Sequence, residues 1–515
     1  MKQYILLLLL AIVFSVLYAD AFDSKLDLNG DNVRYMQLAQ NISQGVGFNN
    51  ITPAGVVPES HFPPGYPFFL SVFMTMGINN LVFFKILNGI LLLASLILLF
   101  YLVRKLTDNV SLAFAVTLLP AFSPHLLHFS GMAMSEMLFL FLSTLCLFGL
   151  YKYSAGNTKS FWKNPWFYVA IASAGASYYV RAVGFATIFA VIVFFFFRKE
   201  WKQAAASVVG CILIIAPWMI RSRGMGGRYT DAILAVNHWR PEEGTISTVG
   251  DLVKKLWQNF DDAFIKGCKE ILFPFMSVDY GAGSDVLGIA GGLLIWGLIL
   301  YGAWNLGKLR WAFIAYIIGN VGMVILGTGG NGSRYVIPIA PLLFVCFYIG
   351  IYSILKQFVF KKENKIAVHF PYAFLIMALF MFPAVKAQTA VSKQPYPKSY
   401  QNYFSIAKEL QKQDVQGKIC CCRKTELFSY YAPKLFTINY LYSTEPKEVI
   451  QHMVDNKVDF VVLEQLGYGS TYRYLYPTIQ QYPQFFVPVW HLQDPDTYLF
   501  RFELQKAKEE LGLGS

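Results

Sequence analysis

The chain has 515 residues, of which 55% are hydrophobic and only 14% are charged. Its mean hydropathy is +0.44, and apolar runs of about 18 or more residues recur, the length that a helix needs to cross a hydrocarbon core of about 30 Å. These features exclude a soluble globular protein and predict a polytopic α-helical membrane protein. The net charge of +12 would suggest a nucleic-acid partner in a soluble protein, but most Lys and Arg residues lie in short loops between apolar runs, as the positive-inside rule predicts.

The first apolar run, about residues 4–19, follows a short positive start and is similar to a secretory signal. It has no clean small-residue cleavage site, so we interpret it as an uncleaved first helix with Lys2 in the cytoplasm. The distribution of basic loops predicts about 11 spans in a transmembrane domain over residues 1–385, with a cytoplasmic N-terminus and an extracytoplasmic C-terminus. The other predicted spans are about 81–103, 111–129 with a break at its prolines, 134–151, 166–180, 182–197, 203–220, 286–306, 311–327, 336–355 and 368–385.

Two polar segments, 20–67 and 221–285, are predicted to lie outside the membrane. In the first, residues 31–45 carry apolar side chains at a roughly helical spacing, which predicts an amphipathic helix on the membrane surface that ends at Gly45 and Gly47. This segment closes with FPPGYP, in which the prolines stiffen the chain and Gly65 permits a close backbone approach.

From about Lys386 the charged residues return, and helical and strand-like periods alternate. We expect a small extracytoplasmic α/β domain over residues 386–515. Within it, KICCC predicts a buried strand, and KVDFVVLEQ predicts a buried parallel strand after a helix. Cys420, Cys421 and Cys422 fit a place in the core of this domain, with a disulfide or a metal site as the alternative.

The first outer segment supplies the candidate catalytic acid, Asp31, in GDNVRY just before the surface helix. One hypothesis makes Asp31 a general base that faces a site at the membrane surface, where partial burial raises its proton affinity. The alternative is a helix cap, which stabilises a helix by about 1 kcal/mol. His61 is a candidate for orienting a substrate, although an ordinary loop histidine fits its position equally well.

Four arginines fall at the predicted outer ends of spans, against the positive-inside bias: Arg181, Arg221, Arg223 and Arg334. Ionisable residues at such depth are costly and often functional, and the planar guanidinium binds phosphate well. Arg334 follows GTGGNGS and precedes Tyr335, where it could reach a lipid phosphate. The alternative for each arginine is an ion pair with Glu136 or an aspartate, although the collection of all four on one side favours phosphate binding.

The sequence contains no P-loop, no GxGxxG after a strand, no HExxH and no CxxC pair, and it has no visible internal repeat. A cytoplasmic nucleotide or nucleotide sugar is therefore not expected as a substrate. We expect any activated substrate to reach the site through the membrane.

Four motifs follow one another in a recognisable order: an acid before a surface helix in GDNVRYMQLAQNISQG, the re-entry FPPGYPFFL, the pair Ser135–Glu136 at the start of a helix, and RYVIPIAP at a late span. With an outer C-terminal domain, this order resembles the GT-C superfamily of membrane glycosyltransferases. Within it, the chain resembles the protein O-mannosyltransferases (the dolichyl-phosphate-mannose-protein mannosyltransferase family) and the lipid A aminoarabinose transferases. The resemblance covers nearly the whole chain in layout.

This resemblance implies a polyprenyl-phosphate-linked sugar as donor, an acceptor on the outer face (a protein, lipid A or another glycolipid), and inversion at the anomeric carbon. It implies that Asp31 takes the proton of the acceptor hydroxyl and that Arg334 stabilises the departing lipid phosphate. Some members have two adjacent acids where this chain has Asp31–Asn32, so we expect neither a cofactor nor a metal site, with a divalent metal as the less favoured alternative. The hypothesis assigns catalysis to Asp31, donor-phosphate binding to Arg334, Arg181 and Arg221, and substrate positioning to Tyr35, His61, Tyr66, Glu136 and Tyr335.

Two other functions stay open from the sequence. An envelope transporter or lipid flippase would usually place ionisable residues at mid-membrane and often shows repeated halves. An inactive relative, whose C-terminal domain only binds a glycan or a protein, would not need both Asp31 and Arg334. The general style of the chain suggests a bacterial inner membrane; the sugar, the acceptor and the oligomeric state are not determined by the sequence.

Overall fold

The computed structural model describes residues 2–53, 55–156, 160–223, 225, 244–327, 332–360 and 365–512. In their described parts, these residues form two compact units. Unit 1 gathers Met1–Lys25, Ser60–Ile233 and Thr248–Lys393, and unit 2 gathers Leu26–Glu59, Leu234–Ser247 and Gln394–Ser515. The first polar segment is therefore divided between the units, with Asp31 in unit 2 and FPPGYP in unit 1.

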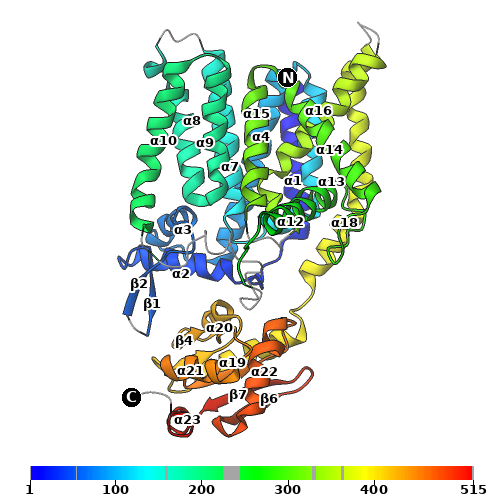
Figure 1. Cartoon of the computed structure of the whole chain (residues 1–515). Helices are drawn as coiled ribbons and strands as arrows, with labels where there is room; N and C mark the ends of the chain where they lie inside the picture. Colours follow the sequence, from blue (N-terminus) through cyan, green and yellow to red (C-terminus); the bar gives the residue numbers. More distant parts are fainter. Residues whose placement is uncertain are drawn as a thin grey trace. The chain divides into compact units, whose positions relative to one another are not determined.

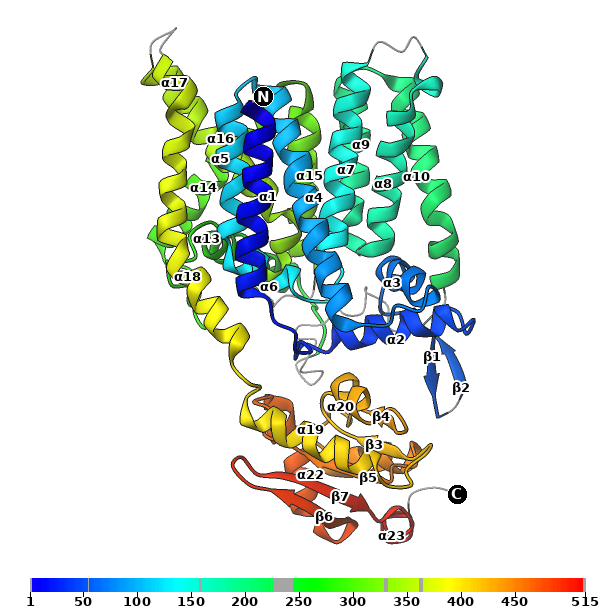
Figure 2. The ribbon, with the colours of Figure 1, turned by 180° about the vertical axis from the view of Figure 1, so that it is seen from behind.

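Unit 1 is a bundle of apolar helices (Figures 1 and 2). In the part of the chain that the structure describes, eight helices are long and apolar enough to cross a membrane, or up to nine if a bent pair is one span. The helical membrane architecture is thus confirmed, while the count of about 11 spans stays a prediction. Every predicted apolar run coincides with helix: α1 (Lys2–Ala21), α4 (Leu81–Thr107), α5 (Val110–Leu118) with α6 (Pro124–Ser130), α7 (Glu136–Ala155), α8 (Pro165–Val180), α9 (Phe185–Phe197), α10 (Trp201–Ser222), α14 (Val286–Trp304), α15 (Arg310–Ile325), α16 (Ala340–Phe358) and α18 (Ile376–Lys393).

The span with two prolines is bent, as the sequence predicts. Its two parts, Val110–Phe122 and Pro124–Ser130, meet at 69°. The Ser123 side chain accepts a hydrogen bond from the Leu126 amide, so the second part begins with a side-chain cap. Pro124 then occupies a first-turn position, where its missing N–H costs no helical hydrogen bond.

Glycines bring two of the spanning helices into close contact. A Cβ atom on Gly302 of α14 would collide with the carbonyl oxygen of Cys346 on α16, and one on Gly350 of α16 would collide with the carbonyl oxygen of Leu298 on α14. Lipid gives helices little hydrophobic reason to associate, so a close approach of backbones at small residues is a main source of packing energy. The α14–α16 pair is therefore a rigid part of unit 1.

The described part of the second outer segment packs on unit 1 as three short helical pieces: α12 (Val249–Phe260), the π-helix η5 (Asp261–Lys266) and α13 (Gly267–Leu272). The Asn259 amide donates hydrogen bonds of 2.8 and 3.1 Å to the carbonyl oxygens of Ile325 and Gly327 at the end of α15. Lys266 forms ion pairs with Asp261 and Asp262, at 3.2 and 2.9 Å. The Asn259 hydrogen bonds therefore fix the segment against the end of α15, and the Lys266 ion pairs stabilise the segment internally.

Unit 2 contains a five-stranded sheet in the order β4-β3-β5-β7-β6. The strands β3, β4 and β5 are parallel, and β7 joins β5 and β6 in antiparallel pairs. Helices surround the sheet, and the hairpin of β1 and β2 with the helix α2 belongs to the same unit. The bounds are β1 (Asn49–Thr52), β2 (Gly55–Pro58), β3 (Ile419–Cys421), β4 (Phe436–Ile438), β5 (Phe460–Leu463), β6 (Phe486–Leu492), β7 (Thr497–Phe502), α2 (Asp31–Ser43), α19 (Lys398–Gln411), α20 (Thr425–Tyr431), α21 (Pro446–Asp455), α22 (Tyr476–Gln481) and α23 (Leu504–Leu511).

Both strands predicted from the sequence are confirmed. KICCC supplies β3 and KVDFVVLEQ supplies β5, which follows α21 and pairs with β3 in parallel. Cys420, Cys421 and Cys422 are completely buried and none of them forms a disulfide. Burial raises the pKa of the Cys420 and Cys421 thiols well above the ordinary value. The cysteines therefore act as small core residues, and the sheet confirms the small α/β part of the predicted fold. Its extracytoplasmic location stays a prediction.

Candidate active site

The most concentrated charge cluster among the predicted site residues is a carboxylate shared by two arginines in unit 1. Arg181 Nη1 lies 2.9 Å from Glu136 Oε1, and Arg334 Nε lies 3.5 Å from the same oxygen. Glu136 is fully buried, whereas the arginine side chains are 18% and 21% exposed. Arg181 Nη1 also donates a 3.0 Å hydrogen bond to Ser135 Oγ. The ion pairs that the sequence offered as the alternative for these two arginines are therefore present.

Three separate segments of the chain supply this cluster. Glu136 is the first residue of α7, and Arg181 lies in extended backbone directly after α8. Arg334 lies in the short 3-10 helix η7 (Gly332–Tyr335), before α16. All three side chains therefore come from the ends of helices, where a polar group costs less than it would at the centre of a span.

The FPPGYP motif supports the same region. A Cβ on Gly65 would lie 2.7 Å from the carbonyl oxygen of Tyr179, two residues before Arg181, so only glycine permits this approach of α3 (Gly65–Thr75) to α8. Tyr66 is fully buried, and its hydroxyl accepts a 3.1 Å hydrogen bond from the Asn88 amide. The structure thus places Tyr66 in packing against α4, with no exposed surface of its own for a substrate.

Asn88 links Tyr66 to the start of α7. Its amide nitrogen donates to the carbonyl oxygens of Met132 and Met134, at 2.5 and 2.9 Å, just before Ser135. A buried amide with several hydrogen bonds resists displacement because each lost bond would leave a polar group unsatisfied. The backbone that presents Glu136 is therefore held in one conformation.

The short helix with Arg334 rests on the second outer segment. A Cβ on Gly332 would lie 2.7 Å from the Tyr280 ring, and the φ of Gly332 is +45°. The Tyr280 hydroxyl donates a 2.6 Å hydrogen bond to Glu270 Oε2, and His125 Nε2 lies 3.6 Å from Glu270 Oε1. Burial, followed by the hydrogen bond to Glu270, raises the pKa of Tyr280 well above its ordinary value, so the phenol stays protonated at neutral pH.

The chemistry of the cluster suits an anion as its ligand. Two guanidinium groups, which bind phosphate well, come together at one carboxylate, and both arginines keep some exposure. The buried carboxylate would meanwhile keep both guanidinium groups in place.

Asp31 belongs to unit 2, where it is the first residue of α2. The N-cap position is occupied by Gly30, with φ of 97° and without a side-chain cap hydrogen bond, so of the two positions that the sequence left open for Asp31, the N-cap or a residue beside it, Asp31 takes the second. As a first-turn acid, Asp31 still interacts favourably with the helix dipole. Its assignment as a general base stays a prediction.

The remaining predicted residues lie on several elements of the two units. Tyr35 lies buried on α2 in unit 2. His61 is exposed in unit 1, with its ring edge-on to Phe62. Tyr335 is partly buried and ends η7 beside Arg334. Arg221 lies in the last turn of α10, and its guanidinium lies 5.3 Å from the centre of the Trp218 ring.

Sequence reasoning missed two buried charged groups. Lys85 of α4 is 1% exposed and donates to the carbonyl oxygens of Asp23, at 2.8 Å, and of Lys25. Glu59 is 2% exposed, accepts a 2.9 Å hydrogen bond from the Asn50 amide, and lies 3.2 Å from Arg34. The sequence did carry a signal for Lys85, because a lysine inside an apolar run is unusual. Nothing in the local sequence distinguishes Glu59.

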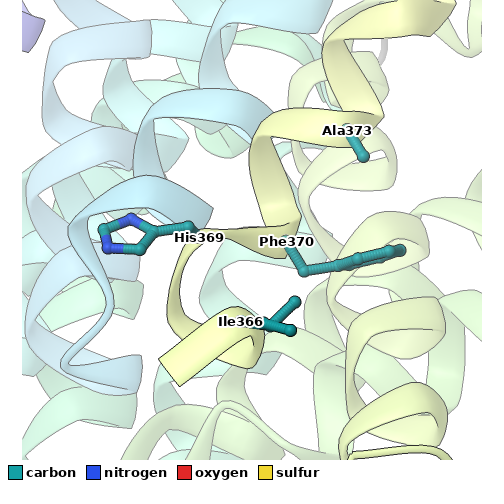
Figure 3. Close-up of a pocket in the computed structure, with 4 residues that line it drawn as sticks. All are labelled: Ile366, His369, Phe370 and Ala373. Carbon is teal, nitrogen blue, oxygen red and sulfur yellow. The ribbon is translucent and has the colours of Figure 1, made fainter. Parts of the chain in front are cut away.

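An apolar pocket lies elsewhere in unit 1 and includes none of the predicted site residues. It is lined by Ile366, His369, Phe370 and Ala373. Figure 3 shows Ile366, Phe370 and Ala373 around one hollow, with the His369 ring on the other side of the chain. Figure 2 places α17 (Lys365–His369) at the same end of the bundle as the N-terminus. In the described part of the chain, no group of three or more His, Cys, Asp or Glu residues is arranged to hold a metal ion.

Comparison with known proteins gives a consistent class. A family described as "Dolichyl-phosphate-mannose-protein mannosyltransferase" matches residues 54–221. Among solved structures, the oligosaccharyltransferase AglB from Archaeoglobus fulgidus, in complex with an inhibitory peptide and a dolichol-phosphate, has a TM-score of 0.61 at 12% identity over 97% of this chain and 74% of that chain. ArnT from Cupriavidus metallidurans bound to undecaprenyl phosphate has a TM-score of 0.58 at 12% identity, over 96% of this chain and 97% of that chain. No curated protein matches the chain in sequence.

The chain thus has the fold of the class of membrane glycosyltransferases to which these structures belong, with helices long and apolar enough to cross a membrane. Within that class, the mannosyltransferase family match covers the part of the chain from the end of the first outer segment to Arg221. Both findings confirm the resemblance that the order of motifs predicts.

Proposed function

We propose that this protein is an inverting glycosyltransferase that moves a sugar from a polyprenyl-phosphate donor to an acceptor on the outer face of a bacterial inner membrane. The observation that carries the proposal is the Glu136–Arg181–Arg334 cluster. It joins two of the motifs that resemble the GT-C family, Ser135–Glu136 and RYVIPIAP, and presents two guanidinium groups that suit a phosphate. The two similar structures that contain dolichol-phosphate and undecaprenyl phosphate support a lipid phosphate as the ligand class.

In the proposed reaction, the acceptor oxygen attacks the anomeric carbon on the face opposite the phosphate. The bond between that carbon and the phosphate oxygen breaks, and its electron pair stays on the polyprenyl phosphate. Arg334 and Arg181 stabilise the negative charge that develops on this oxygen. Asp31 receives the proton of the acceptor hydroxyl. Inversion follows because the acceptor replaces the phosphate in a single displacement.

Glu136 has a positioning role in this proposal. A carboxylate at 2.9 and 3.5 Å from two guanidinium groups holds cations that would otherwise repel each other. We propose that Arg221 assists at a more distant part of the lipid phosphate, that Tyr35, His61 and Tyr335 contact the donor or the acceptor, and that Tyr66 positions the start of α7 through Asn88. We also propose that the reaction needs no metal ion, because Asn32 follows Asp31 where some relatives have a second acid.

The test measures donor binding and transfer separately on purified protein in lipid nanodiscs, with a pool of labelled polyprenyl-phosphate sugars and a bacterial envelope extract as the acceptor source. Asp31→Asn keeps the size of the side chain but cannot accept the proton, so it should bind the donor and lose transfer. Arg334→Gln should lose both. Lys386→Gln is the matched control, because it removes a cation whose partner is the partly exposed Asp20, 2.8 Å away.

Each outcome is decisive for one part of the proposal. Transfer by Asp31→Asn at the wild-type rate would remove Asp31 from catalysis. Equal loss of donor binding in Arg334→Gln and Lys386→Gln would show a general charge effect in place of a phosphate site. If the wild type binds the lipid but transfers no sugar from any donor, a lipid flippase or transporter becomes the better description.

A further inference from the structure

The parallel strands of unit 2 contain a topological switch point. The chain passes from β3 to β4 on one side of it, and then to β5 on the other side of β3. In open α/β sheets, ligands bind outside the carboxyl ends of the strands at such a reversal. Here that place is the carboxyl end of β3 and β5, directly after Cys421 and Leu463.

Cations and aromatic rings gather at this place. Arg423 follows β3, and its guanidinium lies 4.6 Å from the centre of the Tyr468 ring and 5.6 Å from that of the Tyr442 ring. Lys424 Nζ lies 5.1 Å from the centre of the Tyr468 ring. The side chains of Arg423, Lys424, Tyr442 and Tyr468 are all partly exposed. We name these four residues the carboxyl-edge cluster.

The loop after β5 holds this cluster in position. Arg423 Nε donates a 2.9 Å hydrogen bond to Ser470 Oγ. The Tyr440 hydroxyl lies 3.0 Å from Ser470 Oγ and 3.1 Å from Thr471 Oγ1. Glu464, which is 1% exposed, accepts hydrogen bonds from the Thr471 hydroxyl and the Leu466 amide. The guanidinium is therefore fixed before any ligand arrives, which lowers the entropy cost of binding.

The same edge of the sheet is tied to the loop that carries Asp31. Lys424 Nζ donates a 2.7 Å hydrogen bond to the carbonyl oxygen of Asn29. A Cβ on Gly30 would lie 3.6 Å from Glu426 Oε2, and the Gln37 amide of α2 donates a 2.9 Å hydrogen bond to Ser429 of α20. Asp31 is two residues after Asn29, a backbone distance of at most about 7 Å. A ligand on the carboxyl-edge cluster would therefore lie close to Asp31.

We propose that the carboxyl-edge cluster is the acceptor-binding site and that the acceptor is an anionic saccharide, with a phosphate or carboxylate near the hydroxyl that receives the sugar. This inference rests on the proposed function, because Asp31 is its base. The guanidinium and the ammonium bind the anionic group. The rings of Tyr442 and Tyr468 offer flat surfaces with hydroxyl groups at their edges, which suits the apolar face and the hydroxyls of a sugar ring.

A polypeptide acceptor fits these observations less well. An extended peptide is usually bound by main-chain hydrogen bonds at the edge of a sheet, with pockets for alternate side chains. The carboxyl-edge cluster instead lies at the ends of central strands, and β4 and β6 are the edge strands. Its chemistry is that of an anion site with aromatic walls.

The test uses the full-length protein in nanodiscs and saturation-transfer NMR with three probes: glucose 6-phosphate, glucose and inorganic phosphate. The wild type should bind glucose 6-phosphate more tightly than either of the others. Arg423→Gln should weaken that binding at least tenfold, because it removes a charge-assisted contact. If Arg423→Gln does not fold, Arg423→Lys takes its place in the binding measurement, because it replaces the guanidinium and keeps the charge. Lys418→Gln is the matched control, since Lys418 lies at the amino end of the same strand, 5.6 Å from the Phe460 ring.

Donor binding is measured in parallel so that the two proposals can fail separately. Arg423→Gln should bind the polyprenyl-phosphate donor normally and show a raised acceptor KM in the envelope-extract assay. No preference of the wild type for the sugar phosphate, or equal effects of Arg423→Gln and Lys418→Gln, would overturn the acceptor site and leave the transferase proposal intact. Binding of an uncharged Ser/Thr peptide that depends on Arg423, without binding of the sugar phosphate, would overturn it in favour of a polypeptide acceptor.

Discussion

Replacement of Glu136 by Gln tests whether the buried carboxylate organises the two arginines. The change keeps the shape of the side chain and removes its charge, so Arg181 and Arg334 lose their shared partner and repel each other. At an effective dielectric constant of about 20, each of the two contacts corresponds to about 5 kcal/mol of attraction. Removal of one partner of a buried pair costs about 3–5 kcal/mol. Because both arginines are partly exposed, water recovers part of this loss, and we expect about 3 kcal/mol.

The measurement is thermal unfolding followed by tryptophan fluorescence in one detergent. For a chain of 515 residues, a loss of about 3 kcal/mol corresponds to a fall in Tm of about 3 °C. Asp108→Asn is the matched control, because Asp108 is 91% exposed in its ion pair with Arg104 and such a pair contributes about 0.5 kcal/mol. The double variant Glu136→Gln/Arg334→Gln should be less destabilised than the sum of its single changes, since it removes one of the two repelling cations.

Donor binding should fall together with stability in Glu136→Gln, because the guanidinium groups lose their orientation. If Glu136→Gln and Asp108→Asn unfold within about 1 °C of the wild type, the carboxylate does not hold the cluster and the reasoning is wrong. A large loss of stability with unchanged donor binding would keep the ion pair as a structural feature and separate it from the phosphate site.

Three further predictions follow from other parts of the chain. Gly302→Ala should disrupt the α14–α16 contact and lower Tm by several degrees, because its Cβ would collide with the Cys346 carbonyl. Gly291→Ala on the same helix is the control and should be neutral, because its Cβ meets nothing within 4 Å. Equal Tm values for the two variants would contradict this prediction. Asp261→Asn should destabilise the protein at pH 7. Burial acts to raise the pKa of Asp261, but hydrogen bonds from Ser284 and the pairing with Lys266 outweigh it and lower this pKa. The stabilisation by the Asp261 carboxylate is therefore present above about pH 4 and should disappear as the pH falls further, which Tm measured against pH will show. Transfer should persist after EDTA treatment, and an activity that returns only on addition of a divalent ion would refute the metal-independent mechanism.

The sequence predicted the membrane helices well because their signal is local. A run such as 81–103 needs no distant partner to be apolar and long enough, and α4 appears there. KICCC and KVDFVVLEQ were also predictable, since continuous apolar residues after a helix suit a parallel strand that is covered on both faces. Their register with each other was not predictable, because it depends on contacts between segments about 40 residues apart.

The partners of the candidate site residues were predictable only as alternatives. Arg181 and Arg334 were recognised as unusual cations, and Glu136 as a possible partner, but a sequence cannot show that both arginines reach the same oxygen. The contact of Gly65 with the Tyr179 carbonyl could not be predicted from the sequence for the same reason. Glycine permits close approach, and its sequence position does not say what approaches.

The four aspartates of the first outer segment also illustrate why sequence position alone gives a weak assignment. Asp20 forms ion pairs with Lys386 and Lys393, at 2.8 and 3.1 Å, and Asp23 with Lys25 at 2.8 Å. Asp27 accepts a hydrogen bond from the Asn29 amide, as in a local turn. Each of these contacts gives its carboxylate a local structural role.

These contacts also anchor the chain on the approach to Asp31. Asp20 fastens the end of α1, Lys85 binds the backbone at Asp23, and Lys424 binds the backbone at Asn29. A general base must stay within hydrogen-bond reach of the proton it takes, which a long polar loop could not ensure without such supports. The acids before Asp31 thus serve to position the loop that leads to it.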